Sequence, residues 1–116
     1  MTTIIIQQDK EFAYKGIICM GHAEYARRKL FSRHTEADVV CAAISVLVTT
    51  TLNSLEELAK EPMNQDNNQE TGFIKCEFKG RLHEKSIFLL DSMIFGLEQI
   101  QQEYGDKYLQ IKFEEV

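Results

Sequence analysis

Apolar residues recur along this chain with two periods, one of two residues and one of about 3.6 residues. Short β-branched or alternating segments predict four strands, at residues 3–7, 14–20, 72–79 and 107–113. Longer segments with helical spacing predict two helices, at residues 38–59 and 83–104. The resulting order, ββαβαβ, predicts an α+β fold in two layers, with both long helices on one face of a four-stranded sheet.

The same periodicity predicts which residues face the core. In the strand at residues 14–20, alternation places Ile18, Met20 and then His22 on one face, which we assign to the helix layer. The last strand is expected to point Leu109, Ile111 and Phe113 inward. The first helix is expected to bury Val40, Ile44, Leu47, Thr51, Leu55 and Leu58, beside a stripe of Cys41, Ser45, Thr49 and Leu52. The polar run at residues 64–68 predicts a solvated loop.

Length and composition limit the possible classes of protein. A chain of 116 residues predicts a single domain, residues 1–116, with one core. The net charge of −5 argues against nucleic-acid binding through bulk charge. No apolar run approaches the length of a membrane span, and the N-terminus lacks a signal-peptide pattern. Three cysteines without paired spacing predict free thiols in a reducing compartment, hence a cytoplasmic protein.

Cys41 is the candidate nucleophile, because it lies where the first long helix begins. With Asp38 as the N-cap, Cys41 is the third helical residue, and the unpaired N–H groups and helix dipole there favour a thiolate. A capping box from Thr35 to Asp38 would start the helix one turn earlier. His22 at the end of a predicted strand supplies a base. No recognisable zinc spacing links the histidines and cysteines, so we expect neither a metal nor a cofactor.

Two separated motifs show a resemblance to a known family. Gly-His-Ala at residues 21–23, a polar loop, and Asp-Val-Val-Cys-Ala-Ala-Ile-Ser opening a helix within residues 38–56 resemble the ribosomal-processing cysteine protease family. The resemblance covers the whole chain in length and element order. It implies a small bacterial endopeptidase with a His22–Cys41 dyad, which removes the N-terminal extension of a large-subunit ribosomal protein. It also implies a homodimer.

Several roles remain open between alternatives. Ser45 is placed one turn from Cys41 to donate to the site, or it bonds back to its own helix. Asp38 either orients His22 or caps the helix. The basic loop after Gly21 either contacts the substrate or is a solvated loop, and the residues concerned are Ala23, Tyr25, Arg27, Arg28 and Phe31. The alternative to a protease is a non-catalytic, ribosome-associated peptide-binding module.

Overall fold

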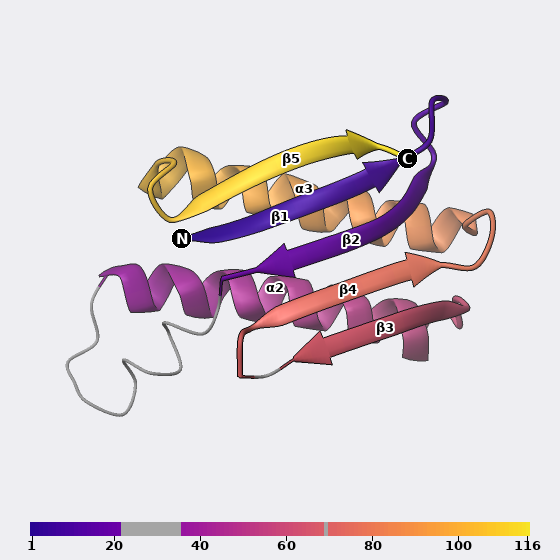
Figure 1. Cartoon of the computed structure of the whole chain (residues 1–116), viewed down its shortest axis with the longest axis horizontal. Helices are drawn as coiled ribbons and strands as arrows, with labels where there is room; N and C mark the ends of the chain where they lie inside the picture. The colour runs from indigo at the N-terminus through magenta and orange to yellow at the C-terminus, as the bar shows by residue number, and fades with distance from the viewer. Residues whose placement is uncertain (22–35, 69) are drawn as a thin grey trace.

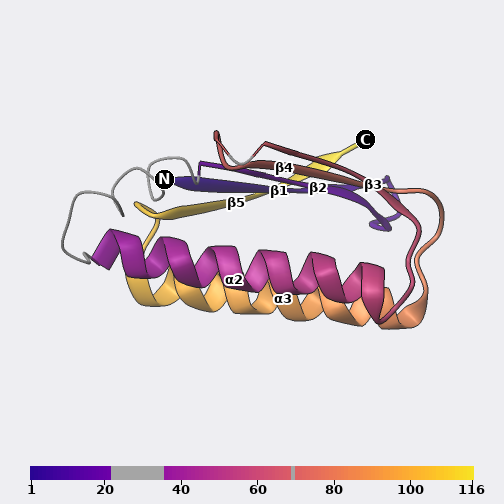
Figure 2. The same cartoon turned by 90° about the horizontal axis from the view of Figure 1, so that it is seen from below.

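The computed structural model describes residues 1–21, 36–68 and 70–116, and it arranges them in two layers (Figure 1). One layer is a five-stranded sheet, and the other is a pair of helices lying side by side across one face of that sheet (Figure 2). The elements are β1 Thr2–Gln8, β2 Tyr14–Met20, α2 Glu36–Glu57, β3 Met63–Asn68, β4 Phe73–Phe78, α3 Glu84–Tyr104 and β5 Leu109–Glu115. The predicted α+β class, with both long helices on one face, is confirmed.

The strands lie in the order β3-β4-β2-β1-β5 across the sheet. β1 and β2 form an antiparallel hairpin, β2 pairs antiparallel with β4, and β4 pairs antiparallel with β3. β5 runs parallel to β1, with Thr2 opposite Leu109. Because β4 and β5 point the same way, the chain needs a crossover between them, and α3 provides it.

The core lies between the sheet and the helices. Thr2, Ile4 and Ile6 of β1 are buried, whereas the residues between them are partly exposed, as expected for a strand with one covered face. The helices bury Val40, Ile44, Val48, Leu52 and Leu55 from α2, and Leu90, Met93, Ile94 and Leu97 from α3. Full burial of one such side chain contributes about 1.5–3 kcal/mol, so this layer holds the helices on the sheet.

The sheet has one strand more than the sequence predicted. Residues 64–68, expected to form a solvated loop, belong to β3, which pairs with β4 from Met63–Phe78 to Asn68–Phe73. Asparagine and glutamine have low strand propensity, but pairing with a neighbouring strand overrides that preference. β3 lies at the edge of the sheet, and five of its six residues are exposed, so polar side chains are tolerated there.

Some predicted core faces were also wrong. In β2, Ile17 and Cys19 are buried under the helices, whereas Met20 is exposed. The face that includes Ile18 and Met20 is therefore the open face. The prediction was wrong because both faces of this strand are apolar, and alternation alone could not tell them apart. Leu58 lies beyond the end of α2, and Phe113 lies on an edge strand; both are exposed.

By length and composition, α2 is the one described helix that could cross a membrane. The expectation that no apolar run approaches a membrane span was therefore wrong. Four of its residues, Val40, Ile44, Val48 and Leu55, are completely buried against the sheet and α3. A core helix of this kind meets the same criteria of length and composition, so the criteria alone do not make α2 a membrane span.

A buried carboxylate ties the loop after α2 to the beginning of α3. The side chain of Glu61 is 3% exposed, and its Oε1 accepts hydrogen bonds from Ser86 Oγ at 2.7 Å and from the His83 backbone N–H at 3.2 Å. His83 Nδ1 lies 3.0 Å from the same oxygen. Burial raises the pKa of Glu61, but the bonds from Ser86 and His83 outweigh it, so the pKa lies below its usual value. A negative charge at this helix N-terminus is also favoured by the helix dipole.

We predict that Glu61→Gln lowers the free energy of unfolding at pH 7 by about 1–3 kcal/mol, because the bonds to a charged acceptor are lost. The folded-state pKa of Glu61 is depressed, so its contribution is complete above the unfolded-state pKa and is lost as pH falls through the folded-state pKa. Urea unfolding from neutral to acidic pH should therefore show the two proteins converging in acid. Glu57→Gln, at an exposed acid, is the control and should change little. A constant difference at every pH would contradict the assignment.

Candidate functional site

Cys41 lies in the second turn of α2, five residues after Glu36, and its side chain is partly exposed. The helix therefore begins earlier than the Asp38 N-cap predicted, and that capping role was wrong, because Asp38 is inside the helix and buried. The alternative start one turn earlier agrees with these bounds. Since only the first four N–H groups of a helix lack intrahelical partners, the N–H of Cys41 is already hydrogen-bonded within the helix. The expected stabilisation of a thiolate by a helix start is thus weaker than predicted.

The groups around Cys41 determine how readily it ionises. Burial raises the pKa of the Cys41 thiol most strongly, and the carboxylate of Asp38 raises it further. Hydrogen bonds with the hydroxyls of Thr2 and Ser45, and the amino group of Met1, act in the opposite direction. The net effect is a raised pKa. These described groups therefore favour the thiol on balance, and a positive charge next to it would favour the thiolate.

Gly21 brings the end of β2 to the same place. It follows the last residue of β2 with φ of 108°, a conformation that side-chain-bearing residues rarely adopt. A Cβ on Gly21 would clash with the carbonyl oxygen of Met1 and would lie 3.1 Å from Cα of Thr2. Gly21 and Cys41 thus both adjoin Thr2, one through the backbone and the other through the hydroxyl. The described end of this segment, Gly21, therefore lies near Cys41.

The remaining predicted residues of this region lie outside the described residues. They include the predicted base, His22, and a second histidine, His34, together with the predicted substrate-loop residues Ala23, Tyr25, Arg27, Arg28 and Phe31. Of the predicted loop at residues 23–37, Glu36 and Ala37 belong to α2. Of the predicted site, the structure therefore brings together Cys41, Ser45 and Asp38.

The beginning of α2 is tied to the same end of the sheet. Tyr108 Oη donates a hydrogen bond of 2.6 Å to Glu36 Oε2, and the backbone N–H of Thr2 donates one of 2.9 Å to the Tyr108 carbonyl oxygen. Lys107 Nζ lies 4.0 Å from the Glu36 carboxylate. Tyr108 therefore links the first turn of α2 to the start of β1, which fixes the helix that presents Cys41. Thr2 and Tyr108 were not singled out from the sequence, where the only indication is a β-branched residue opening a strand.

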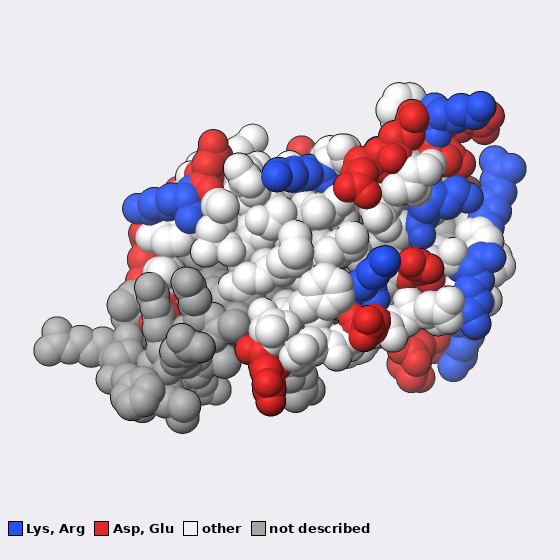
Figure 3. Space-filling view, viewed as in Figure 1, with Lys and Arg blue, Asp and Glu red and all other residues white. Residues whose placement is uncertain are grey.

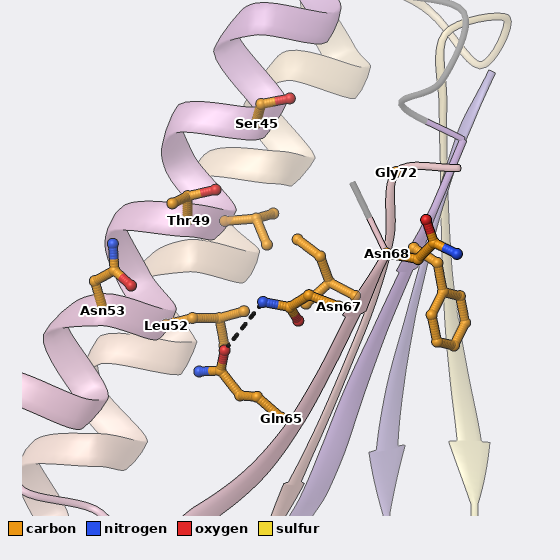
Figure 4. Close-up of a pocket in the computed structure, with 11 residues that line it drawn as sticks. Ser45, Thr49, Leu52, Asn53, Gln65, Asn67, Asn68 and Gly72 are labelled. Carbon is orange, nitrogen blue, oxygen red and sulfur yellow. Dashed lines mark hydrogen bonds between the residues drawn. The ribbon is translucent and has the colours of Figure 1, made fainter. Parts of the chain in front are cut away.

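A groove of about 250 Å³ begins beside Ser45 and runs between α2 and the β3–β4 hairpin (Figure 4). Ser45, Thr49 and Asn53 line it from the helix, while Gln65 and Asn67 project toward the helix from β3. Val48, Leu52, Ile74 and Phe73 add apolar surface. The helical half of this groove includes Ser45, Thr49 and Leu52 of the predicted stripe. The carboxamides opposite were not predicted, because residues 64–68 were expected to form a solvated loop.

Comparison with known proteins gives consistent matches. The sequence profile of a family described as Cysteine protease Prp matches residues 1–110. The Ribosomal processing cysteine protease Prp of Bacillus subtilis (strain 168) is 30% identical over 99 residues, covering 79% of this chain and 82% of that protein. The essential ribosomal processing protease Prp from S. aureus, in complex with a substrate peptide, has a TM-score of 0.82 at 19% identity, with 98% of this chain and 100% of that chain covered. The S. aureus protease with a covalently linked product peptide has a TM-score of 0.79 at 20% identity, with the same coverage.

We predict that Gly21→Ala lowers the free energy of unfolding by about 1–3 kcal/mol, because the new Cβ would clash with Met1 and the backbone conformation would be strained. Gly80→Ala is the matched control: its Cβ would meet no atom within 4 Å. Chemical unfolding of both variants measures the difference. Equal effects of the two substitutions would show that the contact between Gly21 and Met1 does not constrain the fold.

Proposed function

This chain belongs to the cysteine protease Prp family, and on that premise we propose that Cys41 and His22 form its catalytic dyad. The proposed reaction is endoproteolytic removal of the N-terminal extension of a large-subunit ribosomal protein during ribosome maturation. One observation supports Cys41 above all. Of the three cysteines, Cys19 and Cys76 are buried and Cys41 alone is partly exposed.

The surroundings of Cys41 supply the physical argument for a basic partner. A thiol with a raised pKa is a poor nucleophile at neutral pH, since the thiolate is the attacking species. An imidazolium beside it would lower that pKa and stabilise the ion pair. His22 follows Gly21 directly, and Gly21 shares the neighbour Thr2 with Cys41. We therefore assign the role of base to His22.

The proposed steps balance as follows. His22 takes the proton from the Cys41 thiol, and the thiolate attacks the carbonyl carbon of the scissile peptide bond. His22 then gives that proton to the leaving amine as the C–N bond breaks, which leaves a thioester on Cys41. A water molecule, deprotonated by His22, attacks the thioester, and the collapsing intermediate releases the new carboxyl end and regenerates the thiol. The S. aureus relative bears a covalently linked product peptide, which is consistent with this chemistry.

We assign supporting roles to two described residues. The Ser45 hydroxyl lowers the pKa of Cys41 through a hydrogen bond, so it favours the thiolate directly. The carboxylate of Asp38 has the opposite effect on Cys41, although it is buried in the same turns of α2. A negative charge beside a nucleophilic thiolate is useful where it stabilises the imidazolium partner. We therefore propose that Asp38 orients His22.

A separate proposal concerns the basic loop that follows His22. We propose that its residues Ala23, Tyr25, Arg27, Arg28 and Phe31 contact the substrate.

The proposal includes a cytoplasmic homodimer. The outer surface of the helix layer presents large apolar side chains to solvent, among them Val46 and Phe95, each 65% exposed, and Phe88. A second copy covering this surface would remove these side chains from water, which is the main favourable term in association. Cys19, Cys41 and Cys76 are not joined by disulfides, which fits a reducing compartment.

We predict that Cys41→Ala abolishes cleavage, by at least about 10³-fold, because the nucleophile is removed. The probe is a set of synthetic peptides tiling the N-terminal regions of the large-subunit ribosomal proteins of the source organism. Cys76→Ala is the control, since it deletes a thiol from the core and should cut the same peptide while unfolding more easily. Undiminished cleavage by Cys41→Ala would exclude Cys41. A wild-type protein that binds a peptide and never cuts it would favour the binding module.

We predict that His22→Ala raises the pKa of Cys41 and slows its alkylation by iodoacetamide at least about tenfold near pH 7, because the cationic partner is lost. The two proteins should converge at high pH, where Cys41 is ionised in both. Mass spectrometry can follow Cys41 alone, because burial raises the pKa of Cys19 and of Cys76 to about 12. His34→Ala is the control, with an unchanged profile expected. Identical profiles for wild type and His22→Ala would exclude His22 as the base.

A further inference from the structure

The groove between α2 and the β3–β4 hairpin is continuous with the nucleophile. Ser45 contributes to both, since its hydroxyl bonds to the Cys41 thiol and its side chain lines the groove. Four residues along a helix correspond to about 6 Å, so the groove opens one turn from the reacting sulfur. A peptide whose scissile bond lies at Cys41 therefore passes the mouth of this groove if it runs along α2.

The chemistry of the lining is unusual for this chain. Charged residues make up 27% of the sequence, yet among the described residues, 1–21, 36–68 and 70–116, none that lines the groove is charged. Seen on the open face of the sheet, charged side chains gather near the β1–β2 and β4–α3 connections, whereas the middle of that face is largely uncharged (Figure 3). A charged substrate side chain in the groove would lose hydration without gaining a counter-charge, which is unfavourable.

The polar groups that are present suit a peptide. Asn53, Gln65 and Asn67 each offer a carboxamide, which can donate and accept hydrogen bonds, as the backbone of an extended peptide requires. Asn67 Nδ2 lies 3.5 Å from Gln65 Oε1, a long bond that a substrate group can replace at little cost. Asn68 is different, because its Oδ1 accepts the N–H groups of Glu70 and Thr71 and so holds the hairpin turn.

The size of the groove limits what it can hold. About 250 Å³ is less than the roughly 300–1,000 Å³ of a typical small-molecule pocket. A volume of this size suits a few side chains of a peptide. Val48, Leu52 and Ile74 provide the apolar surface for such side chains.

We infer that this groove is a substrate subsite, which holds a short, extended and uncharged stretch of the peptide on one side of the bond that Cys41 attacks. The inference rests on the proposed function, and it adds the wall of β3 carboxamides and helix residues Thr49 and Asn53 as determinants of specificity. It also defines what the site rejects, namely lysine, arginine, aspartate or glutamate at the substrate positions that enter the groove.

The experiment places a charge in the groove without changing its shape. Asn67→Asp on β3 and Asn53→Asp on α2 are nearly isosteric and lie on opposite walls. Asn64→Asp is the matched control, since residues 64 and 67 project from opposite faces of β3 and Asn64 does not line the groove. For the peptide that the wild type cuts, both groove variants should raise KM at least about fivefold and leave kcat little changed, whereas Asn64→Asp should leave both unchanged.

A lysine scan of the same peptide then tests complementarity. Each substrate residue is replaced in turn by lysine, and kcat/KM is measured for wild type and the three variants. At the positions that enter the groove, lysine should lower the kcat/KM of the wild type. Asn67→Asp or Asn53→Asp should raise kcat/KM for these lysine peptides at least about tenfold, and Asn64→Asp should not. Such rescue is a readout that simple loss of fold would not produce.

The outcomes separate the two proposals. Absence of cleavage of every peptide by the wild type would overturn the proposed function, and with it this subsite. Normal cleavage by the wild type, with the KM values of both groove variants equal to that of Asn64→Asp and no lysine position rescued, would overturn the subsite alone. Two outcomes support the subsite. One is rescue of lysine-substituted peptides at adjacent or alternate substrate positions, and the other is a rise in KM confined to the groove variants.

Discussion

The geometry of the site depends on the packing of Thr2, the first residue of the sheet. Its backbone N–H bonds to the Tyr108 carbonyl oxygen and so joins β1 to the start of β5. Its buried hydroxyl bonds to the thiol of Cys41, and its Cα, together with the carbonyl group of Met1, leaves no room for a side chain on Gly21. Three segments far apart in the sequence therefore meet at the start of β1. The position of the nucleophile is thus set by the sheet as much as by its own helix.

The parts of the fold that sequence reasoning predicted are those where burial alone determines structure. α3 was predicted to within one residue, and β1 and β2 closely, because their apolar residues have a clear period and bury one face. β3 was missed because an edge strand needs no apolar pattern: Asn64, Gln65 and Asn67 form a strand through pairing with β4. The face of β2 toward the helices could not be predicted either, since Ile17 and Ile18 are equally apolar and only tertiary packing distinguishes them.

The candidate site shows the same division. Cys41, Ser45 and Asp38 could be grouped from the sequence, because helical spacing alone brings them together. Their electrostatics could not be predicted, because the pKa of Cys41 depends on its burial and on Thr2 and Met1, which lie far from it in the sequence. The helix also starts before Asp38, so the helix dipole stabilises a Cys41 thiolate less than predicted. A cationic partner therefore has a larger part in stabilising the thiolate. Beside the buried carboxylate of Asp38, ionisation of the partly exposed Cys41 thiol is disfavoured, and a neighbouring positive charge would favour it.

The polar composition of β3 meets two physical requirements at once. An edge strand with unpaired backbone groups invites association with other chains, and polar side chains make its surface less adhesive. The same side chains, Gln65 and Asn67, form one wall of a groove that starts beside the nucleophile. A charged edge would meet the first requirement equally well, but it would place fixed charges in the groove and favour substrates of opposite charge. Neutral carboxamides satisfy both requirements, and this explains why an otherwise unfavourable strand sequence occurs at this edge.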